Sequence, residues 1–365
     1  MNSRLCYSGL ACRIYLTQNT CRIMKIKVIG NISDFKNLEE DWNILFGLKN
    51  NYSTFQSFEF NYFSWKYDLS KSKNILSIVV LYENNIIKSI LPFYIDRRLR
   101  LRFINDLHAD FCDCLTNIEI NLNEVIKELQ SKFIIRYFNL INLRTNSCIL
   151  ENQLPDYCKL ISSSEYSILP LEKGVFPDNF SRYRSKQKTE FRRIKKINKD
   201  KKHEIIDCNI SVFPVSDIQK LRSEIIKLGF RDKIFLPSSQ LLLIEELYNK
   251  GKIILSIVKT NNKINAISFV VKDSNQYLTW IDMFDNSKMI NIFNYISLIT
   301  VLSSEESVKI NFGRGKYKYK LLNFLPQSKD LFTLQIFSSK WQELKYSLEQ
   351  NIVRFLRFVY KIFKK

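Results

Sequence analysis

Apolar positions along the chain follow two periods, and segments with the two periods alternate. Runs that are apolar or alternate apolar with polar residues predict strands at 75–80, 86–94, 136–143, 253–258, 264–271, 276–282 and 331–337. Windows with apolar residues three or four positions apart predict helices at 125–132, 218–228, 236–249 and 292–302. A further helix is expected from Ser33, which would cap it, and Ser238 or Ser239 would cap the helix at 236–249. This order of elements is typical of an α/β protein with mixed sheets.

One strand pattern occurs twice. Residues 75–79 read ILSIV, and so do residues 254–258. Each copy is followed by an Asn-Asn turn and a second apolar strand, and the copies lie about half a chain apart. A repeat in the same structural context predicts two tandem units. We place these units at 24–170 and 171–339 and expect a separate C-terminal helix at 340–365.

The chain is long enough for two domains, with 365 residues of which 45% are hydrophobic. Its formal net charge of +20 suits an acidic partner such as nucleic acid, anionic lipid or a phosphate-bearing cofactor. A bias towards Lys, Asn and Ile explains the same charge without any partner. Eight cysteines without a CxxC pair predict no disulfide framework and favour a reducing, cytoplasmic compartment.

The two ends of the chain differ from the rest. Residues 1–23 contain Arg but no Lys or Glu, and we interpret them as an N-terminal extension without fixed structure. Residues 341–363 carry an apolar stripe at helical spacing, beside basic residues that continue to Lys365. Such a helix packs on its own protein or lies on an anionic membrane. No apolar run approaches the roughly 20 residues that a membrane span requires.

Basic residues are densest at 181–202, where Phe191, Ile194 and Ile197 give a narrow apolar stripe. This pattern predicts a helix with a solvated basic face. The alternative is a wall of a groove for an anion, including the phosphates of a tRNA.

The segment 310–320 holds the clearest candidate site. It begins as the end of a strand, and Gly313 and Gly315 then flank Arg314. Glycine lets a ligand approach the main chain, and Arg and Lys beside such a turn suit an anion, above all a phosphate.

This segment resembles the signature D-F-x-R-G-x-x-x-Y-K of the CelD-like acyltransferases. That family belongs to the GNAT superfamily and is related to the FemAB-type transferases. Arg314 and Gly315 match the signature, Tyr319 and Lys320 follow at the required spacing, and Asn311 stands where the family has Asp. The resemblance extends to Phe-Gln-Ser at 55–57, to Phe230-Arg231 between two helices, and to the strand end at Asp282. The family's Ser-Pro-Gly helix start and the GNAT loop Q/R-x-x-G-x-G/A are both missing.

The resemblance implies two tandem GNAT-like units and an N-acyltransferase. The donor would be acetyl-CoA or another acyl-CoA, and the acceptor an amine such as an amino sugar or a precursor of cell-envelope polysaccharide. Asp282 and Tyr319 would be catalytic, while Arg314, Gly315 and Lys320 would bind the cofactor. The run 108–114 (HADFCDC) matches no zinc spacing, so no metal is expected, and the resemblance gives it the role of a substrate-side loop.

Two alternatives remain. A FemAB-like transferase would take its acyl group from aminoacyl-tRNA, which the basic segment 181–202 favours. A non-catalytic basic module would bind membrane or nucleic acid, which the missing Ser-Pro-Gly element and Asn311 favour. In each case the location expected is the cytoplasm, with peripheral membrane contact through residues 341–365.

Overall fold

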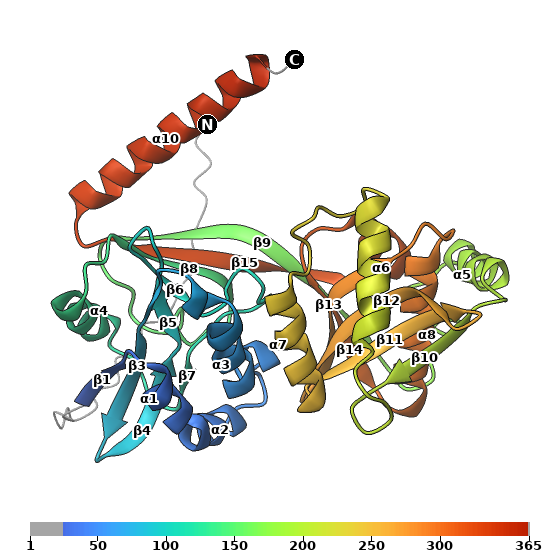
Figure 1. The fold of residues 1–365 in the computed structure, drawn as a ribbon, viewed down its shortest axis with the longest axis horizontal. Helices are drawn as coiled ribbons and strands as arrows, with labels where there is room; N and C mark the ends of the chain where they lie inside the picture. Colours follow the sequence, from blue (N-terminus) through green and yellow to red (C-terminus); the bar gives the residue numbers. More distant parts are fainter. Residues whose placement is uncertain (1–24, 364–365) are drawn as a thin grey trace, which may run out of the picture.

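The computed structural model describes residues 25–363 and consists of two α/β units side by side, joined by long strands (Figure 1). The N-terminal unit contains β1 (Lys25–Ile29), β2 (Ile75–Leu76), β3 (Ile78–Glu83), β4 (Ile86–Leu91), β5 (Phe93–Ile95), β6 (Arg100–Phe103), β7 (Leu115–Thr116) and β8 (Tyr137–Arg144). Its helices are α1 (Ile32–Asn37), α2 (Glu39–Gly47), α3 (Phe58–Tyr67) and α4 (Leu122–Lys132), with the 3-10 turns η1 (Thr54–Gln56) and η2 (Leu69–Lys71).

The C-terminal unit repeats this plan. Its strands are β10 (Lys202–Ile206), β11 (Ile253–Thr260), β12 (Lys263–Asp273), β13 (Gln276–Phe284) and β14 (Val308–Arg314). Its helices are α5 (Ser185–Ile197), α6 (Val215–Lys227), α7 (Ser238–Asn249), α8 (Ile290–Glu305) and α9 (Lys318–Phe324). Two strands, β9 (Cys158–Leu171) and β15 (Gln327–Ile336), connect the units, and α10 (Lys340–Phe363) ends the described chain.

Strand pairing shows the repeat directly. Each unit has one parallel pair, β6 with β8 and β13 with β14, and the remaining pairs of the described sheets are antiparallel. In each unit a helix lies between the two parallel strands along the chain, α4 in the first and α8 in the second. The predicted α/β class with mixed sheets and two tandem units is therefore confirmed.

The repeated sequence ILSIV opens equivalent hairpins. The β3–β4 turn places Asn84 and Asn85 at φ of 51° and 61°, and the β11–β12 turn places Asn261 and Asn262 at 48° and 65°. Both turns need two residues with positive φ, which Asn tolerates better than most residues. In the first copy Ser77 divides the run, so that β2 joins the large sheet and β3 the small one.

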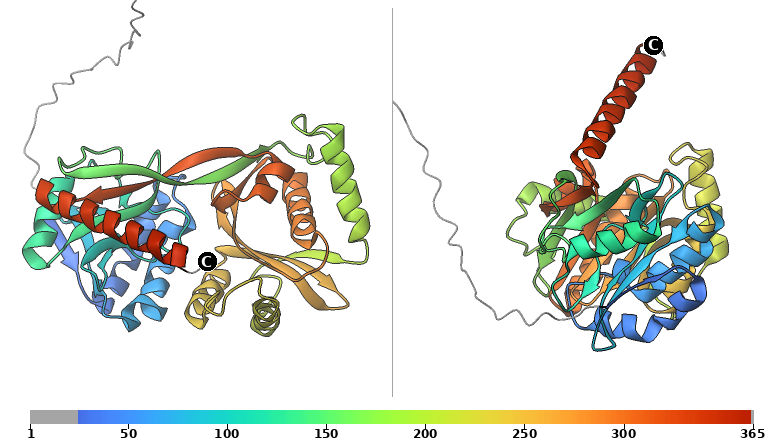
Figure 2. Two further views of the ribbon diagram at one scale, coloured as in Figure 1. Left: turned by 90° about the horizontal axis from the view of Figure 1, so that it is seen from above. Right: turned by 90° about the vertical axis from the view of Figure 1, so that its left-hand side faces the viewer.

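One eleven-stranded sheet runs through both units in the order β10-β11-β12-β13-β14-β9-β15-β8-β6-β5-β2, beside a four-stranded sheet β1-β3-β4-β7. β15 comes late in the chain but pairs with β8 of the first unit and with β9. Figure 2 shows β9 and β15 bridging the units along their upper side. The boundary expected between residues 170 and 171 falls at the end of β9, and the division of the chain into domains stays a prediction.

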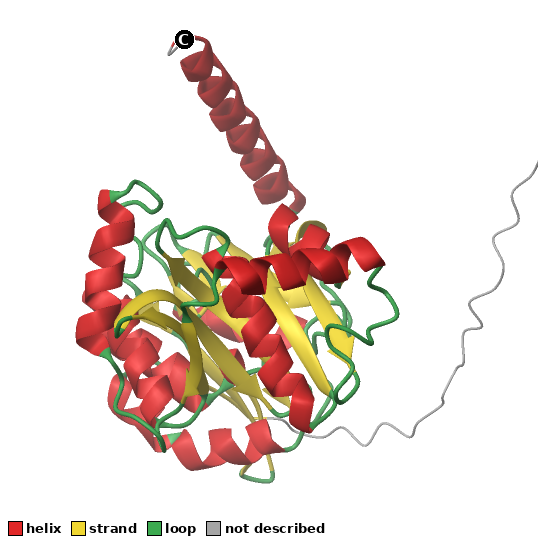
Figure 3. Cartoon of the chain, turned by 90° about the vertical axis from the view of Figure 1, so that its right-hand side faces the viewer, coloured by secondary structure: helices red, strands yellow, loops and turns green. Residues whose placement is uncertain are grey.

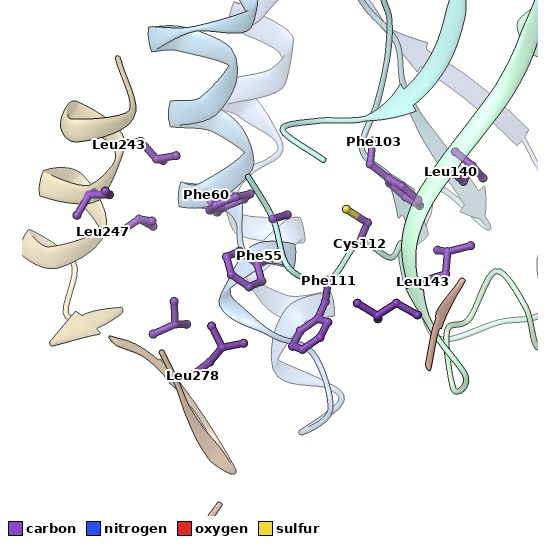
Figure 4. Packing of buried hydrophobic residues seen from close by; sticks show 14 of the residues in the cluster. Phe55, Phe60, Phe103, Phe111, Cys112, Leu140, Leu143, Leu243, Leu247 and Leu278 are labelled. Carbon is purple, nitrogen blue, oxygen red and sulfur yellow. The ribbon is translucent and has the colours of Figure 1, made fainter. Parts of the chain in front are cut away.

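The largest hydrophobic core also crosses between the units. It joins Phe55 and Phe60 of the first unit to Leu243 and Leu247 of α7 and to Leu278 of β13 (Figure 4). Trp280 packs edge-to-face on Phe55, with ring centroids 5.5 Å apart. The two units therefore share buried apolar surface, which favours one fixed arrangement.

Several local expectations need correction. The first helix is capped by Asn31, whose side chain accepts from the Asp34 amide, and Ser33 lies inside the helix. Pro237 precedes α7, so Ser238 is its first helical residue and not its cap. The basic segment at 181–202 contains α5, and the strand β10, which begins at its last residue, was not predicted. The extension expected at 1–23 lies outside the described residues.

α10 leaves the body of the protein, as Figures 1 and 3 show. None of the helices within residues 25–363 combines the length and the apolarity that crossing a bilayer requires.

Candidate active site

A cavity of about 440 Å³ opens where the two units meet. Its walls come from β13, from the end of β14 and the turn into α9, from residues 231–240 and from the loop at 107–110 of the N-terminal unit. Polar and charged side chains from separate parts of the chain converge on it, among them Asp282, Lys320, Arg314, Arg231 and His108. A concave site of this composition is the usual form of a small-molecule pocket.

The cavity exists because β13 and β14 pair only briefly. Their parallel ladder contains two residue pairs, Tyr277 with Ile310 and Leu278 with Asn311. Beyond this point both strands continue, and their later residues line the cavity. Asn311 is fully buried: its amide donates to Gln276 Oε1 at 3.1 Å, and its Oδ1 accepts the Gly313 amide at 3.0 Å. A neutral amide makes both bonds without the cost of burying a charge.

Asp282 is the most densely bonded carboxylate of the cavity. Ser268 Oγ donates to its Oδ1 at 2.7 Å, and the Tyr295 hydroxyl donates to its Oδ2 at 2.5 Å. Lys320 Nζ lies 3.5 Å from the same Oδ2. Two hydroxyl donors and one cation fix the orientation of this side chain.

A chain of hydrogen bonds continues from Ser268 into the core. Asn294 Nδ2 donates to Ser268 Oγ at 3.0 Å, and Ser256 Oγ donates to Asn294 Oδ1 at 2.8 Å. His203 Nε2 lies 2.9 Å from Ser256 Oγ and must be the donor, because the only Ser256 hydroxyl hydrogen is already used. Burial lowers the pKa of His203 to about 4, so its imidazole is neutral at pH 7. Every donor in the chain points towards Asp282.

Lys320 is almost fully buried. Its ammonium donates to the Phe312 carbonyl at 2.8 Å and lies 5.2 Å from the ring centroids of Tyr295 and Tyr317. A carbonyl, a carboxylate and two aromatic faces together compensate for the loss of water around the charge. Its predicted contact with a cofactor stays a prediction, and in the structure its partner is Asp282.

Tyr319 lines the cavity beside Tyr295, with ring centroids 6.3 Å apart. Burial, followed by the negative charge of Asp282, raises the pKa of Tyr319. The same two causes raise the pKa of Tyr295 well above its ordinary value. Both hydroxyls are therefore protonated at neutral pH and can act as donors.

The Gly313–Gly315 turn is held by the N-terminal unit. The Arg314 amide donates to Asp110 Oδ2 at 3.0 Å, and its guanidinium donates to the Leu107 carbonyl at 2.9 Å. Arg314 is partly exposed and lines the cavity, so it can bind an anion. The Gly315 amide donates to the Glu165 carbonyl at 2.8 Å, and the role of Gly315 towards a cofactor stays a prediction.

Asp110 is the buried partner of this turn. Burial raises its pKa to about 6, and the neighbouring Arg314 opposes that rise. Its Oδ2 leaves no space at Gly313, where a Cβ atom would lie 2.6 Å from it. Glycine is required here both by φ of +73° and by this close approach.

Sequence reasoning missed Tyr295, Trp280 and the pairing of Asp110. Tyr295 sits in an apolar helix and carries no local signal. Trp280 Nε1 donates to the His108 carbonyl at 2.7 Å and so joins the units at the cavity. The run 108–114 was expected to be a substrate-side loop, and its residues His108 and Asp110 line the cavity.

Within residues 25–363, the potential metal-ligand atoms of Asp113, Cys114 and Cys148 lie within 4.8 Å of one another. These groups are buried and bond one another, since Cys148 Sγ donates to Asp113 Oδ1 at 2.8 Å. Burial raises the pKa of both thiols, which disfavours the thiolates that a metal would need. The expectation of no metal stays a prediction.

The chain matches no protein-family model and no curated protein sequence. Its fold is similar to the C-terminal domain of a putative lysylphosphatidylglycerol synthetase from Agrobacterium fabrum, with a TM-score of 0.57, 9% identity, and coverage of 87% of this chain and 96% of that one. FemX gives a TM-score of 0.56 at 8% identity, over 81% of this chain and 95% of that one. The L-PGS from Bacillus licheniformis gives a TM-score of 0.54 at 10% identity, over 82% of this chain and 92% of that one.

At such identities the likeness concerns the fold. These neighbours are GNAT-fold proteins that match most of the chain, in agreement with the tandem units described above. The narrower resemblance to CelD-like acyltransferases stays a prediction.

Proposed function

We propose that this protein transfers an acyl group from acyl-CoA to an amine, such as an amino sugar or a cell-envelope polysaccharide precursor. The observation that carries the proposal is the arrangement of Asp282, Lys320 and Tyr319 around one cavity. An amine enters as an ammonium and must lose a proton before it can attack an acyl carbon. Asp282, fixed by Ser268 and Tyr295, is the proton acceptor.

The remaining residues serve the other charges of the reaction. Attack of the amine on the thioester carbon places negative charge on the carbonyl oxygen, and the Lys320 ammonium is the cation that stabilises it. Collapse of this intermediate breaks the C–S bond, and the Tyr319 hydroxyl gives its proton to the departing thiolate. Tyr319 regains a proton from the attacking nitrogen, which loses its second proton as the amide forms, and the proton on Asp282 is the one released. The amide, free CoA and one released proton complete the balance. Arg314 and the exposed Arg231 supply positive charge for the phosphates of the donor.

One observation favours a second donor, aminoacyl-tRNA. The loop before α8 is occupied by its own carboxylate: Asp285 Oδ1 accepts the Ser287 amide at 2.8 Å, and Oδ2 accepts from Asn265 at 2.8 Å. A phosphate is therefore disfavoured at this helix start. Away from the start of α8, the helix α5 presents exposed basic residues that suit an RNA backbone.

The test compares melting temperatures of the full chain with acetyl-CoA, with a longer acyl-CoA and with uncharged tRNA. A ligand that binds only the folded protein raises the melting temperature by mass action. We expect an increase with acyl-CoA that Arg314→Gln reduces and that the control Arg182→Gln, which does not line this cavity, leaves unchanged. Release of CoA thiol in the presence of an amine should then be lost in Asp282→Asn.

The alternatives give different results. An increase with tRNA alone, weakened steeply by salt, supports the aminoacyl-tRNA donor. No increase with any of these ligands contradicts both transferase proposals and leaves a non-catalytic binding module.

A further inference from the structure

The helix α10 is fixed to the body by one face of its first half. Tyr346 packs on Tyr137 and Phe337, with ring centroids 4.7 and 5.5 Å apart, and its hydroxyl accepts from Gln335 at 2.9 Å. Glu343 pairs with Lys159 at 3.0 Å, and Glu349 pairs with Arg136. These contacts define the body side of the helix.

The opposite side of α10 is an apolar stripe. At 100° per residue five of its members lie on the face turned away from Tyr346, and they are Trp341, Leu344, Leu348, Ile352 and Phe355. Leu356 lies at the edge of this face. All of them are exposed: Trp341 to 82%, Leu348 to 62% and Phe355 to 65%. Six large apolar side chains aligned on one projecting helix form a continuous surface, and exposed surfaces of this kind mark interaction sites.

Charge along the helix is distributed unevenly. Both acidic residues of α10, Glu343 and Glu349, are engaged with the body. After Glu349 the sequence contains no acidic residue and five basic ones, Arg354, Arg357, Lys361, Lys364 and Lys365. The second half of the helix therefore contains apolar and basic residues but no acidic residue.

We propose that α10 lies on an anionic lipid bilayer, with its apolar stripe inserted at the level of the headgroups. An amphipathic helix with basic residues beside the apolar face binds by both apolar burial and attraction to anionic lipid. A second copy of the chain fits less well, because pairing two such stripes brings together two helix halves that are both strongly positive. The helix then acts as an arm that holds the protein at the membrane surface.

The experiment is flotation of the full chain with vesicles, which requires no substrate and so stands apart from the proposed transferase activity. One set of vesicles is pure phosphatidylcholine, and the other is an equal mixture with phosphatidylglycerol. We expect the protein to float with the mixed vesicles and to remain largely unbound with phosphatidylcholine alone. The variant Leu344→Ser, Leu348→Ser, Phe355→Ser should bind more than about a hundredfold more weakly.

A second variant and a control separate the causes. Arg354→Gln, Arg357→Gln, Lys361→Gln keeps the stripe and should bind roughly a hundredfold more weakly, since each basic residue near an anionic surface strengthens binding about fivefold. The matched control Ile134→Ser, Val212→Ser, Ile234→Ser removes three apolar side chains of the body that are even more exposed than those of the stripe, and it should bind like the parent. Circular dichroism melting confirms that each variant is folded.

Two results would overturn the proposal. One is a parent protein that does not float with the mixed vesicles, or a stripe variant that floats as well as the parent. The other is a parent that is dimeric by light scattering and does not float while the stripe variant is monomeric, which would show that a second copy covers the stripe.

Discussion

At the scale of single residues, the site depends on how one carboxylate is satisfied among largely buried groups. Buried polar groups are costly unless they are hydrogen-bonded. Asp282 accepts hydrogen bonds from Ser268 of β12 and Tyr295 of α8, and it pairs with Lys320 of α9. Each partner comes from a different element, so the carboxylate keeps its orientation only when the whole unit is folded. Preorganisation of this kind is what a catalytic group requires.

Gly313 gives a prediction at this scale. Gly313→Ala would introduce a Cβ atom 2.6 Å from Asp110 Oδ2 and 2.9 Å from the Thr279 carbonyl, at φ of +73°. Gly229→Ala is the matched control, because Gly229 has φ of +75° and nothing within 4 Å of an added Cβ. We expect the control to lose about 1 kcal/mol of unfolding free energy from strain alone, and Gly313→Ala to lose about 3 kcal/mol or more. Urea unfolding measures both, and equal losses would show that Asp110 can move aside freely.

Only part of this site was predictable from the sequence. Arg314, Tyr319 and Lys320 stand close together in one motif, so a local pattern could single them out. Asp282 was singled out because its strand end resembles that of the CelD-like acyltransferases. Tyr295 and Asp110 were not assigned their contacts, because a tyrosine in an apolar helix and an aspartate in a loop gain their roles only when distant strands meet.

At the scale of elements, the periodicity of apolar residues predicted the strands that bury apolar side chains. It did not predict strands that are extended only because they pair with neighbouring strands. The β11–β12 hairpin was predicted from its apolar runs and its Asn-Asn turn. β9 contains Ser162, Ser163, Ser164 and Glu165, and the sequence predicted no strand there. It is extended because it pairs with β15 along most of its length and with β14 at its end. Tertiary pairing therefore overrode weak local preference.

The attachment of α10 gives a prediction at the element scale. Tyr346→Ala removes the ring contacts with Tyr137 and Phe337 and the bond from Gln335. Losing these contacts costs about 1–2 kcal/mol of docking free energy, which raises the fraction of undocked helix about tenfold. We expect faster tryptic cleavage within α10, while the melting temperature of the body is unchanged. Phe358→Ala, on an exposed position of the same helix, is the control, and similar cleavage of both variants would contradict the attachment described here.

At the scale of the whole molecule, the cavity belongs to neither unit alone. The first unit contributes Leu107, His108 and Asp110, and the second contributes the Asp282 group and Arg314. Thr54 adds a further link through its amide, which donates to Asp273 Oδ1 at 2.7 Å. Because the core and the sheet are both continuous, the two walls of the cavity are held in a fixed relation.

The contact between the units should respond to pH through Asp110. Burial raises its folded pKa from 3.8 to about 6, and Arg314, Lys320 and Asp282 are the charged groups that face it. The folded protein therefore binds this proton more tightly than the unfolded chain does. By linkage the free energy of unfolding falls as pH rises from about 4 to about 6, and the full loss is present above that window.

Asp110→Asn tests this dependence, because an amide oxygen can still accept the Arg314 amide but does not ionise. Between pH 4.5 and pH 7.5 the parent should lose up to about 2 kcal/mol more unfolding free energy than the variant does. Asp106 is buried and has a pKa raised to about 6 as well, so some loss remains in the variant. Urea unfolding at the two pH values measures the difference, with the exposed Asp330→Asn expected to follow the parent. Parallel curves for the parent and Asp110→Asn would mean that the folded protein does not hold the proton on Asp110, and that the turn at Arg314 is joined to the first unit by an ion pair at every pH tested.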